Sequence, residues 1–551
     1  MIKVELIDCT LRDGAYIVNG DFGDDVIVGL IKKLDAANVD IIECGWLKDA
    51  PHKEGSVYYH VPEDVRSYMP LQRKSAAMYT AMIDWDRYDL NALPERSDGS
   101  IDAIRMVFPH GKHKQALALS EKIVSKGYKL FLQAANTLAY TDDELRILAE
   151  DVNRTDAVSL SIVDTFGAMY QEDLERIYRV LDANLNSSIK LGFHSHNNLQ
   201  LSFALCMHFL QLGRHGTRDL IVDSSLCGMG RGAGNATTEL VANYLNRSYA
   251  GNYDMNEILD AIDLYLVRLK EGYEWGYSIP YFIAGIYCTH VNNIAYLRTQ
   301  HKTLAKDMRI IIESIEPETR KKYDYDNLDR IYADYQNRIV DDEAALAEIA
   351  MRFTGRKVLI LAPGMTLQDE EKRVRDYIER ENPVVVAVNF IPSTYSCDCY
   401  FFVNAARYQY ACDTASDIME QKLVITTSNI RVAGHGEKVV NFNLLAKLGW
   451  RFFDNSTIMC LRLCSKIGVH EIAFAGFDGF SESSEGPFYA NRILQADLSS
   501  ELKRKINGDV ISMLEDFCSC DKGRTRIEFV THSLYSKAIA DCPSPLNMMI
   551  S

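Results

Sequence analysis

The stretch IDCTLRDG, residues 7–14, decides how we interpret the first half of the chain. It continues a run from Lys3 whose composition is typical of a β-strand, and it ends in a glycine that favours a turn. The pair Arg12 and Asp13 therefore lies where the first strand enters its loop. In α/β proteins, charged side chains at such strand ends gather at one edge of the sheet and form the functional site.

A second stretch, GFHSHNN at residues 192–198, supplies two histidines that are two residues apart. Because alternate side chains of a strand point to the same side, His194 and His196 can bind one ion together. The Asp13 carboxylate would complete a two-histidine, one-carboxylate set with open positions for substrate and water. Such mixed ligands suit Mn²⁺ or Mg²⁺, with Zn²⁺, Co²⁺ and Fe²⁺ as alternatives. Taken alone, the two histidines also fit an ordinary loop.

Short β-rich runs alternate with amphipathic helical patterns up to about residue 250. The expected strands are 3–7, 39–43, 75–79, 104–107, 129–133, 158–163, 190–193 and 220–222. Eight strands, each followed by a helix, predict a (β/α)₈ barrel over residues 1–251. An open doubly wound sheet is the rival arrangement. The barrel is favoured because the site residues fall at the ends of strands one, seven and eight.

The rest of the chain predicts two further regions. Residues 252–350 are mostly helical and rich in tyrosine and charge, which indicates a helical extension and connector. From residue 351 to 551 a strand-and-helix pattern restarts with KVLILAPG, and further strand-like runs follow. We interpret this part as a Rossmann-like α/β domain. The overall fold class is α/β.

The composition disfavours some classes of binding partner. A net charge of −16 disfavours nucleic acid and anionic membranes, because like charges repel. No apolar run is long enough to cross a bilayer, and the start of the sequence lacks a signal-peptide pattern. The thirteen cysteines are scattered, and their two CxC pairs are poorly spaced for structural zinc. We therefore expect a cytoplasmic protein.

Three motifs together carry a family resemblance. DCTLRDG, HSHNN and DSSLCGMGRGAGNATTELV (residues 223–241) resemble the metal-dependent lyases and aldolases of the DRE-TIM metallolyase superfamily. That group includes 4-hydroxy-2-oxovalerate aldolase, hydroxymethylglutaryl-CoA lyase and isopropylmalate synthase. The likeness covers roughly residues 1–300. It implies a (β/α)₈ barrel that makes or breaks a carbon–carbon bond beside a keto acid.

The resemblance also implies roles for particular residues. Metal binding is implied for Asp13, His194, His196 and Asn235, and stabilisation of an enolate for Arg12. Asp8 and Asp164 match acidic strand-end positions that orient the metal shell or the loops, and we also count them as candidates for substrate binding. Apart from the resemblance, Glu43 and Gln133 lie at strand ends facing the expected site, where each either contacts substrate or has a structural role.

The expected chemistry agrees with these residue types. A pyruvate-like 2-keto acid chelates a metal through its carboxylate and ketone oxygens, and the metal holds the charge of the enolate. A guanidinium beside the ketone oxygen adds charge-assisted hydrogen bonds. A base must also remove the 4-hydroxyl proton during aldol cleavage. The hydroxy-oxovalerate aldolases have a histidine for this step, and here Tyr16 stands at the matching position. A phenol is a poor base near pH 7 unless its pKa is strongly shifted. Either Tyr16 is a catalytic acid/base with a shifted pKa, or another group or a metal-bound water takes this part, or the reaction differs; an ordinary loop tyrosine also fits.

The C-terminal region carries a weaker signal. Gly364 lies in the turn after the KVLILAP strand, and residues 455–481, from Asn455 past Asp478, resemble a stretch of bacterial sialyltransferases. Asp478 would lie at the strand edge where open α/β sheets bind ligands. We therefore expect a nucleotide or nucleotide-sugar site there. His435 is an isolated loop candidate.

The leading hypothesis is a class II metal-dependent aldolase that joins or separates a 2-keto acid and an aldehyde, as in the synthesis of sugar acids or surface polysaccharides. One alternative is an acyl-CoA-dependent lyase or acyltransferase on the same barrel. Another places the main activity, a glycosyl or nucleotide transfer, in the C-terminal domain. The helical extension would either hold the C-terminal domain against the barrel or form a homodimer. The aldehyde, the native metal and the acid/base group are not specified by the sequence.

Overall fold

The computed structural model describes residues 2–70, 75–300, 303–432, 434, 436–481 and 499–539. The chain divides into two compact units. The first comprises Met1–Ala295 and Met308–Tyr323, and the second comprises Tyr296–Asp307 and Asp324–Ser551. The helical extension predicted over 252–350 is thus shared between the two units. His435 lies outside the described residues.

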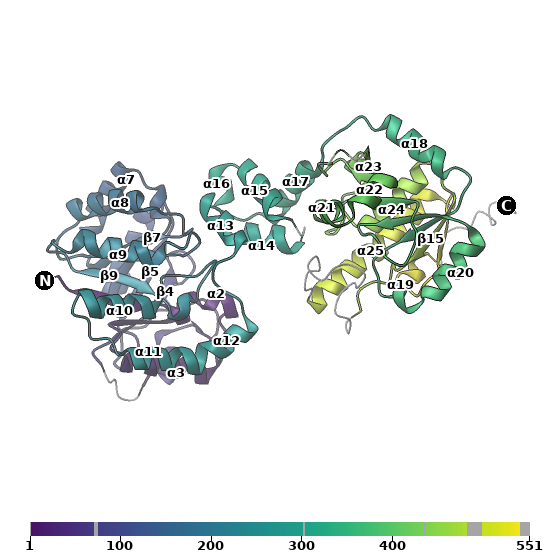
Figure 1. The fold of residues 1–551 in the computed structure, drawn as a ribbon. Coiled ribbons are helices and arrows are strands. Elements are labelled where there is room, and N and C mark those ends of the chain that lie inside the picture. The colour runs from purple at the N-terminus through teal and green to yellow at the C-terminus, as the bar shows by residue number, and fades with distance from the viewer. Residues whose placement is uncertain are drawn as a thin grey trace. The chain divides into compact units, whose positions relative to one another are not determined.

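The first unit is a closed parallel barrel, as predicted (Figure 1). Its strands are β1 (Val4–Asp8), β2 (Ile41–Leu47), β4 (Met78–Asp84), β5 (Ala103–Phe108), β6 (Lys129–Ala134), β7 (Ala157–Asp164), β8 (Lys190–Ser195) and β9 (Leu220–Ser224), with the short β3 (Tyr58–Tyr59) beside β2. The strands pair in the order β1-β9-β8-β7-β6-β5-β4-β2, and β1 also pairs with β2. This last pairing closes the barrel and excludes the open sheet.

Helices connect the barrel strands, with one exception. They are α1 (Thr10–Asp13), α2 (Ala15–Val18), α3 (Asp24–Ala36), α4 (Pro62–Val65), α5 (His113–Leu117), α6 (Ser120–Ser125), α7 (Asp142–Val152), α8 (Gln171–Asn184), α9 (Ser202–Gly213) and α10 (Thr238–Ser248). Residues 85–102, between β4 and β5, contain no helix, contrary to the expectation that one follows every strand. Pro94, Gly99 and several aspartates interrupt helical periodicity in this segment.

The barrel interior is built in layers. Ile7, Ile41, Ala103, Phe131 and Ile221 form an apolar layer inside the barrel. Two residues further along four of the same strands, and therefore on the same side of each strand, stand four polar side chains. They are Glu43, Arg105, Gln133 and Asp223, all buried. The apolar layer thus fills the barrel interior on the side of the amino ends of the strands. The polar layer faces their carboxyl ends, where barrels of this kind carry their active sites.

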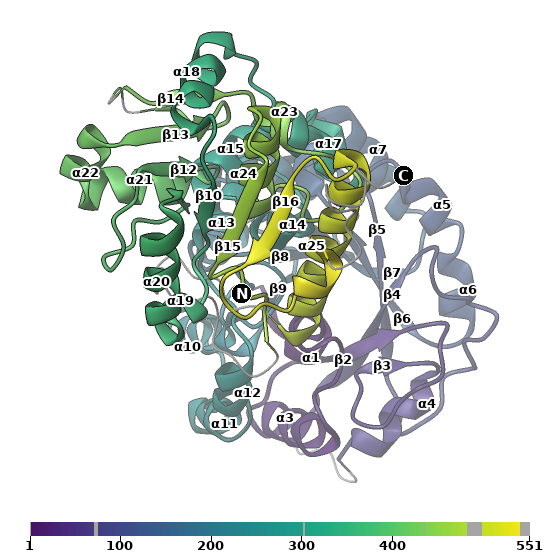
Figure 2. The same ribbon diagram turned by 90° about the vertical axis from the view of Figure 1, so that its right-hand side faces the viewer.

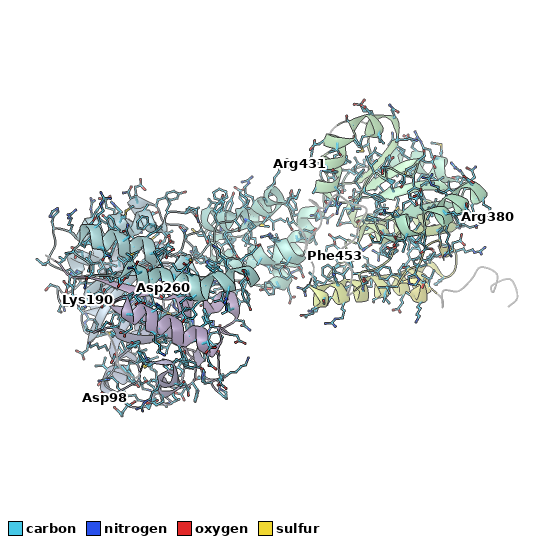
Figure 3. The ribbon with its side chains drawn as sticks, turned by 60° about the horizontal axis from the view of Figure 1, so that its bottom comes forward. Asp98, Lys190, Asp260, Arg380, Arg431 and Phe453 are labelled. Carbon is cyan, nitrogen blue, oxygen red and sulfur yellow. The ribbon has the colours of Figure 1, made fainter. Side chains whose placement is uncertain are left out.

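The amino end of the barrel has a stabilising ion pair. Lys190, labelled in Figure 3, begins β8 and pairs with Glu5 of β1, which Lys3 also contacts. Burial alone would raise the pKa of Glu5, but the two lysines outweigh it and lower that pKa. The ion pair links β1 to β8, which are not neighbours in the sheet, and stands away from the carboxyl ends of the strands.

Short helices follow the barrel. They are α11 (Met255–Ala261), η4 (Ile262–Leu266), α12 (Val267–Gly272), α13 (Ile279–Ile286), α14 (Val291–Gln300), α15 (Ala305–Ser314), α16 (Pro317–Arg320), α17 (Tyr325–Gln336) and α18 (Glu343–Phe353). Side chains cap several of them; Asp254, for example, accepts hydrogen bonds from the backbone N–H groups that begin α11. Among the described residues, no helix combines the length and the apolar character that crossing a membrane requires.

The second unit is a parallel sheet with helices, as predicted (Figure 2). Its strands are β10 (Val358–Leu361), β11 (Val384–Val388), β12 (Cys399–Phe402), β13 (Leu423–Thr427), β14 (Lys438–Val440), β15 (Glu471–Ala475) and β16 (Arg526–Phe529). Its helices are α19 (Thr366–Asp369), α20 (Glu371–Glu381), α21 (Ala405–Thr414), α22 (Ser416–Gln421), α23 (Phe442–Leu445), α24 (Ser456–Lys466) and α25 (Ser500–Asp521). The order is β14-β13-β12-β11-β10-β15-β16, so the direction of winding reverses between β10 and β15.

Candidate metal centre

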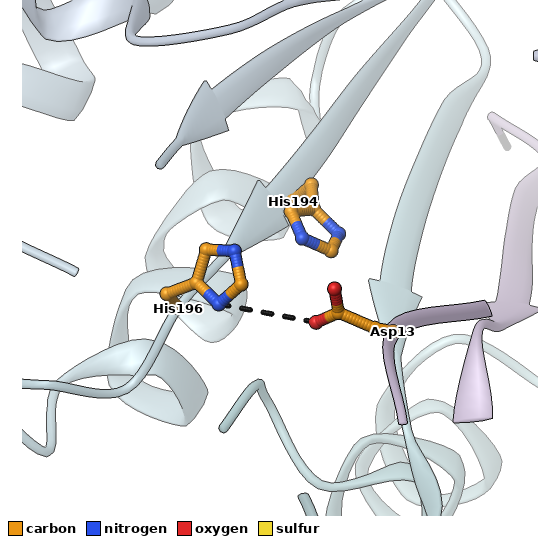
Figure 4. A group of neighbouring side chains, drawn as sticks. All are labelled: Asp13, His194 and His196. Carbon is orange, nitrogen blue, oxygen red and sulfur yellow. Dashed lines mark ion pairs between the residues drawn. The ribbon is translucent and has the colours of Figure 1, made fainter. Parts of the chain in front are cut away.

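Asp13, His194 and His196 meet at the carboxyl end of the barrel (Figure 4). Asp13 is the last residue of α1, the short turn directly after β1, and His194 lies in β8. His196 follows one residue beyond the end of that strand, on the same side as His194. One ligand atom from each lies within 4.8 Å of the others, and all three residues are buried. The three side chains proposed from the sequence as metal ligands therefore lie together in the structure.

Asn235 completes this group from the loop after β9. Its Nδ2 donates a hydrogen bond of 2.5 Å to Asp13 Oδ2, and its backbone forms a bridge with His196. Gly230 allows this close approach, because a Cβ at that position would lie 2.5 Å from both Asp13 Oδ2 and Asn235 Nδ2. The glycine-rich loop thus places an amide against the two-histidine, one-carboxylate set.

The donor set fits a divalent cation. His196 Nδ1 lies 3.9 Å from Asp13 Oδ2 (Figure 4). Neither His196 Nδ1 nor Asn235 Oδ1, both buried, has a hydrogen-bond partner among the described residues. Buried polar atoms without partners are costly, and a bound ion would satisfy such lone pairs. Two imidazole nitrogens with carboxylate and amide oxygens suit Mn²⁺, Mg²⁺ or a neighbouring transition metal.

The protonation states favour metal binding as well. Burial alone would raise the pKa of Asp13, but Arg12 and the two imidazoles outweigh it and lower that pKa to about 2. Burial lowers the pKa of His196 to about 3. Asp13 is therefore an anion and His196 a neutral imidazole at pH 7, the forms in which each residue binds a metal.

Arg12 connects the metal group to the polar layer. Its Nη1 donates to Asp13 Oδ1 at 2.6 Å, and its Nε donates to Glu43 Oε2 at 2.8 Å. Trp46 fixes the backbone by donating from Nε1 to the Arg12 carbonyl oxygen at 3.0 Å. Within the described part of the chain, no hydrogen bond engages Arg12 Nη2. A buried guanidinium held by two carboxylates thus keeps one N–H₂ group for a ligand.

Two residues of the polar layer, Arg105 and Asp223, were not predicted from the sequence. Arg105 donates to Glu43 Oε2 at 2.8 Å and to Gln133 Oε1 at 3.0 Å, and it pairs with Asp223. Asp223 Oδ2 in turn lies 3.0 Å from His194 Nδ1. The signal for Arg105 was a single charge within the apolar strand AIRMVF, and Asp223 opened the third quoted motif.

The contact between Asp223 and His194 fixes the imidazole that the metal would use. A carboxylate on one ring nitrogen orients the ring and directs the other nitrogen toward the ion. Burial alone would raise the pKa of Asp223, but Arg105 and His194 outweigh it and lower that pKa to about 2. Asp223 is therefore an anion that accepts the Nδ1 proton of His194.

The change Asp223→Asn is expected to weaken Mn²⁺ binding about 10- to 100-fold. The amide carries no negative charge, so it holds the His194 ring less firmly and makes its other nitrogen a weaker metal ligand. Isothermal titration with Mn²⁺ measures this loss. Asp182→Asn is the control, since Asp182 also pairs with an arginine, Arg218, but lies on α8. If Asp223→Asn lowered only the stability of the protein and left its Mn²⁺ affinity unchanged, this orienting role would be wrong.

The other predicted acidic residues fix loops. Asp8 accepts hydrogen bonds from Thr10 N at 3.0 Å and from Thr238 Oγ1 at 2.6 Å. Asp164 accepts from the backbone N–H groups of Ala168 and Met169. Burial raises the pKa of Asp8 to about 6 and that of Asp164 to about 7. Both carboxyls hold the loops that follow β1 and β7, so their contact with substrate stays a prediction.

Tyr16 stands beside the metal group without belonging to it. Its ring packs edge-on against Trp46, with 6.1 Å between the ring centres, and the Arg231 guanidinium lies 5.3 Å from its centre. Desolvation by the surrounding protein atoms raises the pKa of Tyr16 to about 12, although 47% of the residue's surface remains exposed. The phenol is therefore protonated at neutral pH, which suits a proton donor and opposes a base.

The residues expected to bind a ligand in the second unit lie at the carboxyl ends of its strands. Asp478 accepts hydrogen bonds from the backbone N–H and the hydroxyl of Thr366. A Cβ at Gly364 would lie 2.4 Å from the Asp478 carboxylate, and Asn455 caps α24. Gly364 and Asp478 meet between β10 and β15, where the winding reverses, whereas Asn455 has a capping role. A nucleotide or nucleotide-sugar site stays a prediction.

Comparisons with known proteins find relatives of the barrel half of the chain. The HMGL-like family model matches residues 130–265. An oxaloacetate decarboxylase from Mycobacterium tuberculosis is 28% identical over 263 residues, which cover 46% of this chain and 74% of the relative. A 4-hydroxy-2-oxovalerate aldolase from Pseudoalteromonas translucida is 25% identical over 281 residues, covering 47% of this chain and 75% of the relative.

One solved structure, the N-terminal domain of a candidate aldolase from Bacteroides vulgatus, is 27% identical. It covers 53% of this chain and 95% of that domain, with a TM-score of 0.47. The two curated relatives, the decarboxylase and the aldolase, are both lyases, and both match the barrel half of the chain.

Proposed function

We propose that the barrel is a divalent-metal-dependent carbon–carbon lyase that forms or cleaves the bond between C3 and C4 of a 2-oxo acid. The observation that carries this proposal is the group of Asp13, His194 and His196, beside which Arg12 keeps a free N–H₂. The named relatives, an aldolase and a decarboxylase of 2-oxo acids, support the same reaction class.

Each group has a part in this reaction. A divalent ion on Asp13, His194 and His196, with Asn235 as a further ligand, would bind the keto acid and act as a Lewis acid on its ketone. Arg12 Nη2 donates to the ketone oxygen, where negative charge develops as the C3–C4 bond breaks. Glu43 and Asp13 hold the guanidinium rigidly, so little reorganisation is needed.

Water is kept out of the lower part of the site. The apolar layer closes the barrel interior beneath the polar layer, and Glu43, Arg105, Gln133 and Asp223 are all buried. In this dry surrounding the Arg12 hydrogen bond is stronger than it would be in water. Glu43 Oε1 and Gln133 Nε2 are buried without a partner among the described residues, so both remain candidates for contacts with substrate.

Tyr16 is the proposed proton carrier in the aldol reaction. In the condensation direction its protonated phenol donates to the oxygen that forms on C4. The change Tyr16→Phe keeps the ring and is expected to slow condensation about 100-fold, at least tenfold more than it slows C3 proton exchange of pyruvate. Rates of both reactions with Mn²⁺ measure this difference. Condensation within threefold of the wild-type rate would exclude the role.

A second candidate reaction is decarboxylation of a 2-oxo acid that carries a carboxylate on C3. The raised pKa of Tyr16 favours it, because loss of CO₂ requires no base. The C3–C4 bond breaks, its electron pair passes to C3, and C3 then takes a proton. Oxaloacetate decarboxylation that survives Tyr16→Phe, in a protein that cleaves no 4-hydroxy-2-oxo acid, would favour this candidate.

The experiment for the proposed function is pyruvate release from 4-hydroxy-2-oxo acids by the full-length protein, with Mn²⁺ and after removal of metal by a chelator. We expect release only with metal. An acyl-CoA substrate, indicated by metal-dependent cleavage of an acyl-CoA and no release of pyruvate, would replace the proposal. A glycosyl or nucleotide transfer by the C-terminal domain, and a homodimer, stay predictions.

A further inference from the structure

Arg231 lies beside the metal group, on the loop after β9. It directly follows Gly230, whose α-carbon stands against Asp13 and Asn235: a Cβ there would lie 2.5 Å from Asp13 Oδ2. The guanidinium is half-buried and lies 5.3 Å from the centre of the Tyr16 ring. Arg231 therefore stands next to both the metal group and the residue that is proposed to serve the C4 side of the substrate.

The guanidinium is held in place without a negative charge. Its Nη2 contacts the imidazole of His290, and the Tyr16 ring supports one face through a cation–π contact. Burial, together with the positive charge of Arg231, lowers the pKa of His290 to about 3. His290 is therefore neutral at pH 7 and cannot repel an anion from Arg231.

Arg231 differs in this respect from the two arginines below it. Arg12 pairs with Asp13 and Glu43, and Arg105 pairs with Glu43 and Asp223. In the part of the chain that the structure describes, no carboxylate pairs with Arg231. A half-buried cation without a counter-ion is poorly compensated, and a substrate anion would compensate it.

We propose that Arg231 binds a second carboxylate of the substrate, on the C4 side of the cleaved bond, so that the natural substrate is a 4-hydroxy-2-oxo diacid. This inference rests on the proposed function. Among the described residues the hydrogen bonds of Arg231 use only Nη2, so its Nη1 and Nε can match the two oxygens of one carboxylate. The aldehyde product, or acceptor in the condensation direction, then carries a carboxylate.

The reaction balances with that carboxylate retained. The C4 hydroxyl passes its proton to the phenolate form of Tyr16, the reverse of the condensation step, and becomes an aldehyde. The C3–C4 bond breaks, and its electron pair passes to C3, which takes a proton from solvent to give the methyl group of pyruvate. The carboxylate beyond C4 stays paired with Arg231 throughout. Loss of this group as CO₂ would leave the electron pair on C4, where the C2 ketone cannot stabilise it, so a substrate of this kind undergoes aldol cleavage and not decarboxylation.

The test compares two substrates that differ only at this group. They are 4-hydroxy-2-oxoglutarate, with a carboxylate beyond C4, and 4-hydroxy-2-oxopentanoate, with a methyl group there. For the full-length protein with Mn²⁺ we expect kcat/KM to favour the diacid at least tenfold. Arg231→Gln is expected to lower kcat/KM for the diacid about 10- to 100-fold more than for the monoacid, because one charge-assisted pair is lost.

Arg214→Gln is the matched control. Arg214 also stacks on a tyrosine, Tyr249, at 5.6 Å, but it lies at the end of α9 that leads to the amino end of β9. This variant should keep the wild-type ratio of the two substrates.

Equal losses on both substrates in Arg231→Gln, or a wild-type preference for the monoacid, would overturn the inference. Proton exchange at C3 of pyruvate in the wild type separates two kinds of failure. Metal-dependent exchange together with an unchanged substrate ratio rejects the Arg231 subsite alone. No exchange with any divalent metal rejects the proposed function and the subsite with it.

Discussion

Asp13→Asn is expected to weaken Mn²⁺ binding about 100-fold or more. Replacing a residue that only hydrogen-bonds to a metal ligand already weakens metal binding by up to about 100-fold, and Asp13 would be a ligand itself. The substitution should also abolish measurable pyruvate release. Asp13 is the one anion of the metal group, and the substitution keeps its shape while removing its charge. Arg12 retains Glu43 as a partner, so the guanidinium stays paired in the variant. Titration with Mn²⁺ and a pyruvate assay at saturating metal measure the two effects.

The control for this change is Asp21→Asn. Asp21 pairs with the exposed Lys53, so the variant loses an aspartate charge without touching the metal group. It should bind Mn²⁺ as the wild type does. If Asp13→Asn kept wild-type Mn²⁺ affinity, the ion would have to bind elsewhere, and the assignment of the metal centre would be wrong.

Arg12→Lys is expected to lower kcat about 10²- to 10³-fold, the cost of removing one preorganised donor to a developing negative charge. A lysine keeps the positive charge but lacks the planar fork, so it cannot donate to Asp13, Glu43 and the ketone oxygen in fixed geometry. Because charge on the ketone oxygen develops in the transition state, KM should change far less than kcat.

Steady-state kinetics at saturating Mn²⁺ measure this difference. Arg214→Lys, directly after α9, serves as the control, since Arg214 lies over the ring of Tyr249 as Arg12 lies over the ring of Trp46. A rise in KM at constant kcat would mean that Arg12 binds substrate and transition state equally. That outcome would contradict its proposed role on the ketone oxygen.

The fold was predictable because each barrel strand is buried on both faces. Such strands appear as short apolar runs, so all eight were placed within a few residues of their observed positions. Their ends were less certain: β2 extends to Leu47, beyond the expected residue 43, through a bulge that Gly45 permits at φ +148°. The missing helix between β4 and β5 reflects the proline and glycine content of that segment.

The two histidines of the metal group were predictable from local spacing, but the residues that hold the metal group in place were not. His194 and His196 are neighbours on one strand, so the sequence alone shows that they share a side. Arg105 and Asp223 lie 118 residues apart, and only barrel closure brings them together. The same holds for Tyr16 and Arg231, which come from the loops after the first and last barrel strands.

In the second unit the parallel sheet was predictable from its strand pattern, but its site was not. Gly364 and Asp478 lie where the winding reverses, as ligand residues of such sheets do. Asp478, however, already accepts two hydrogen bonds from Thr366. A strand-end aspartate can therefore equally fix the turn after β10, and a sequence pattern does not separate this use from ligand binding.

The central claim, that the barrel activates C3 of a 2-oxo acid through its metal group, is tested most directly by hydrogen–deuterium exchange at C3 of pyruvate. The exchange is followed by NMR with and without Mn²⁺, in the wild type and in His194→Ala. We expect exchange in the wild type with Mn²⁺, and none without metal or in His194→Ala. Exchange that persists in metal-free protein or in His194→Ala would contradict the claim.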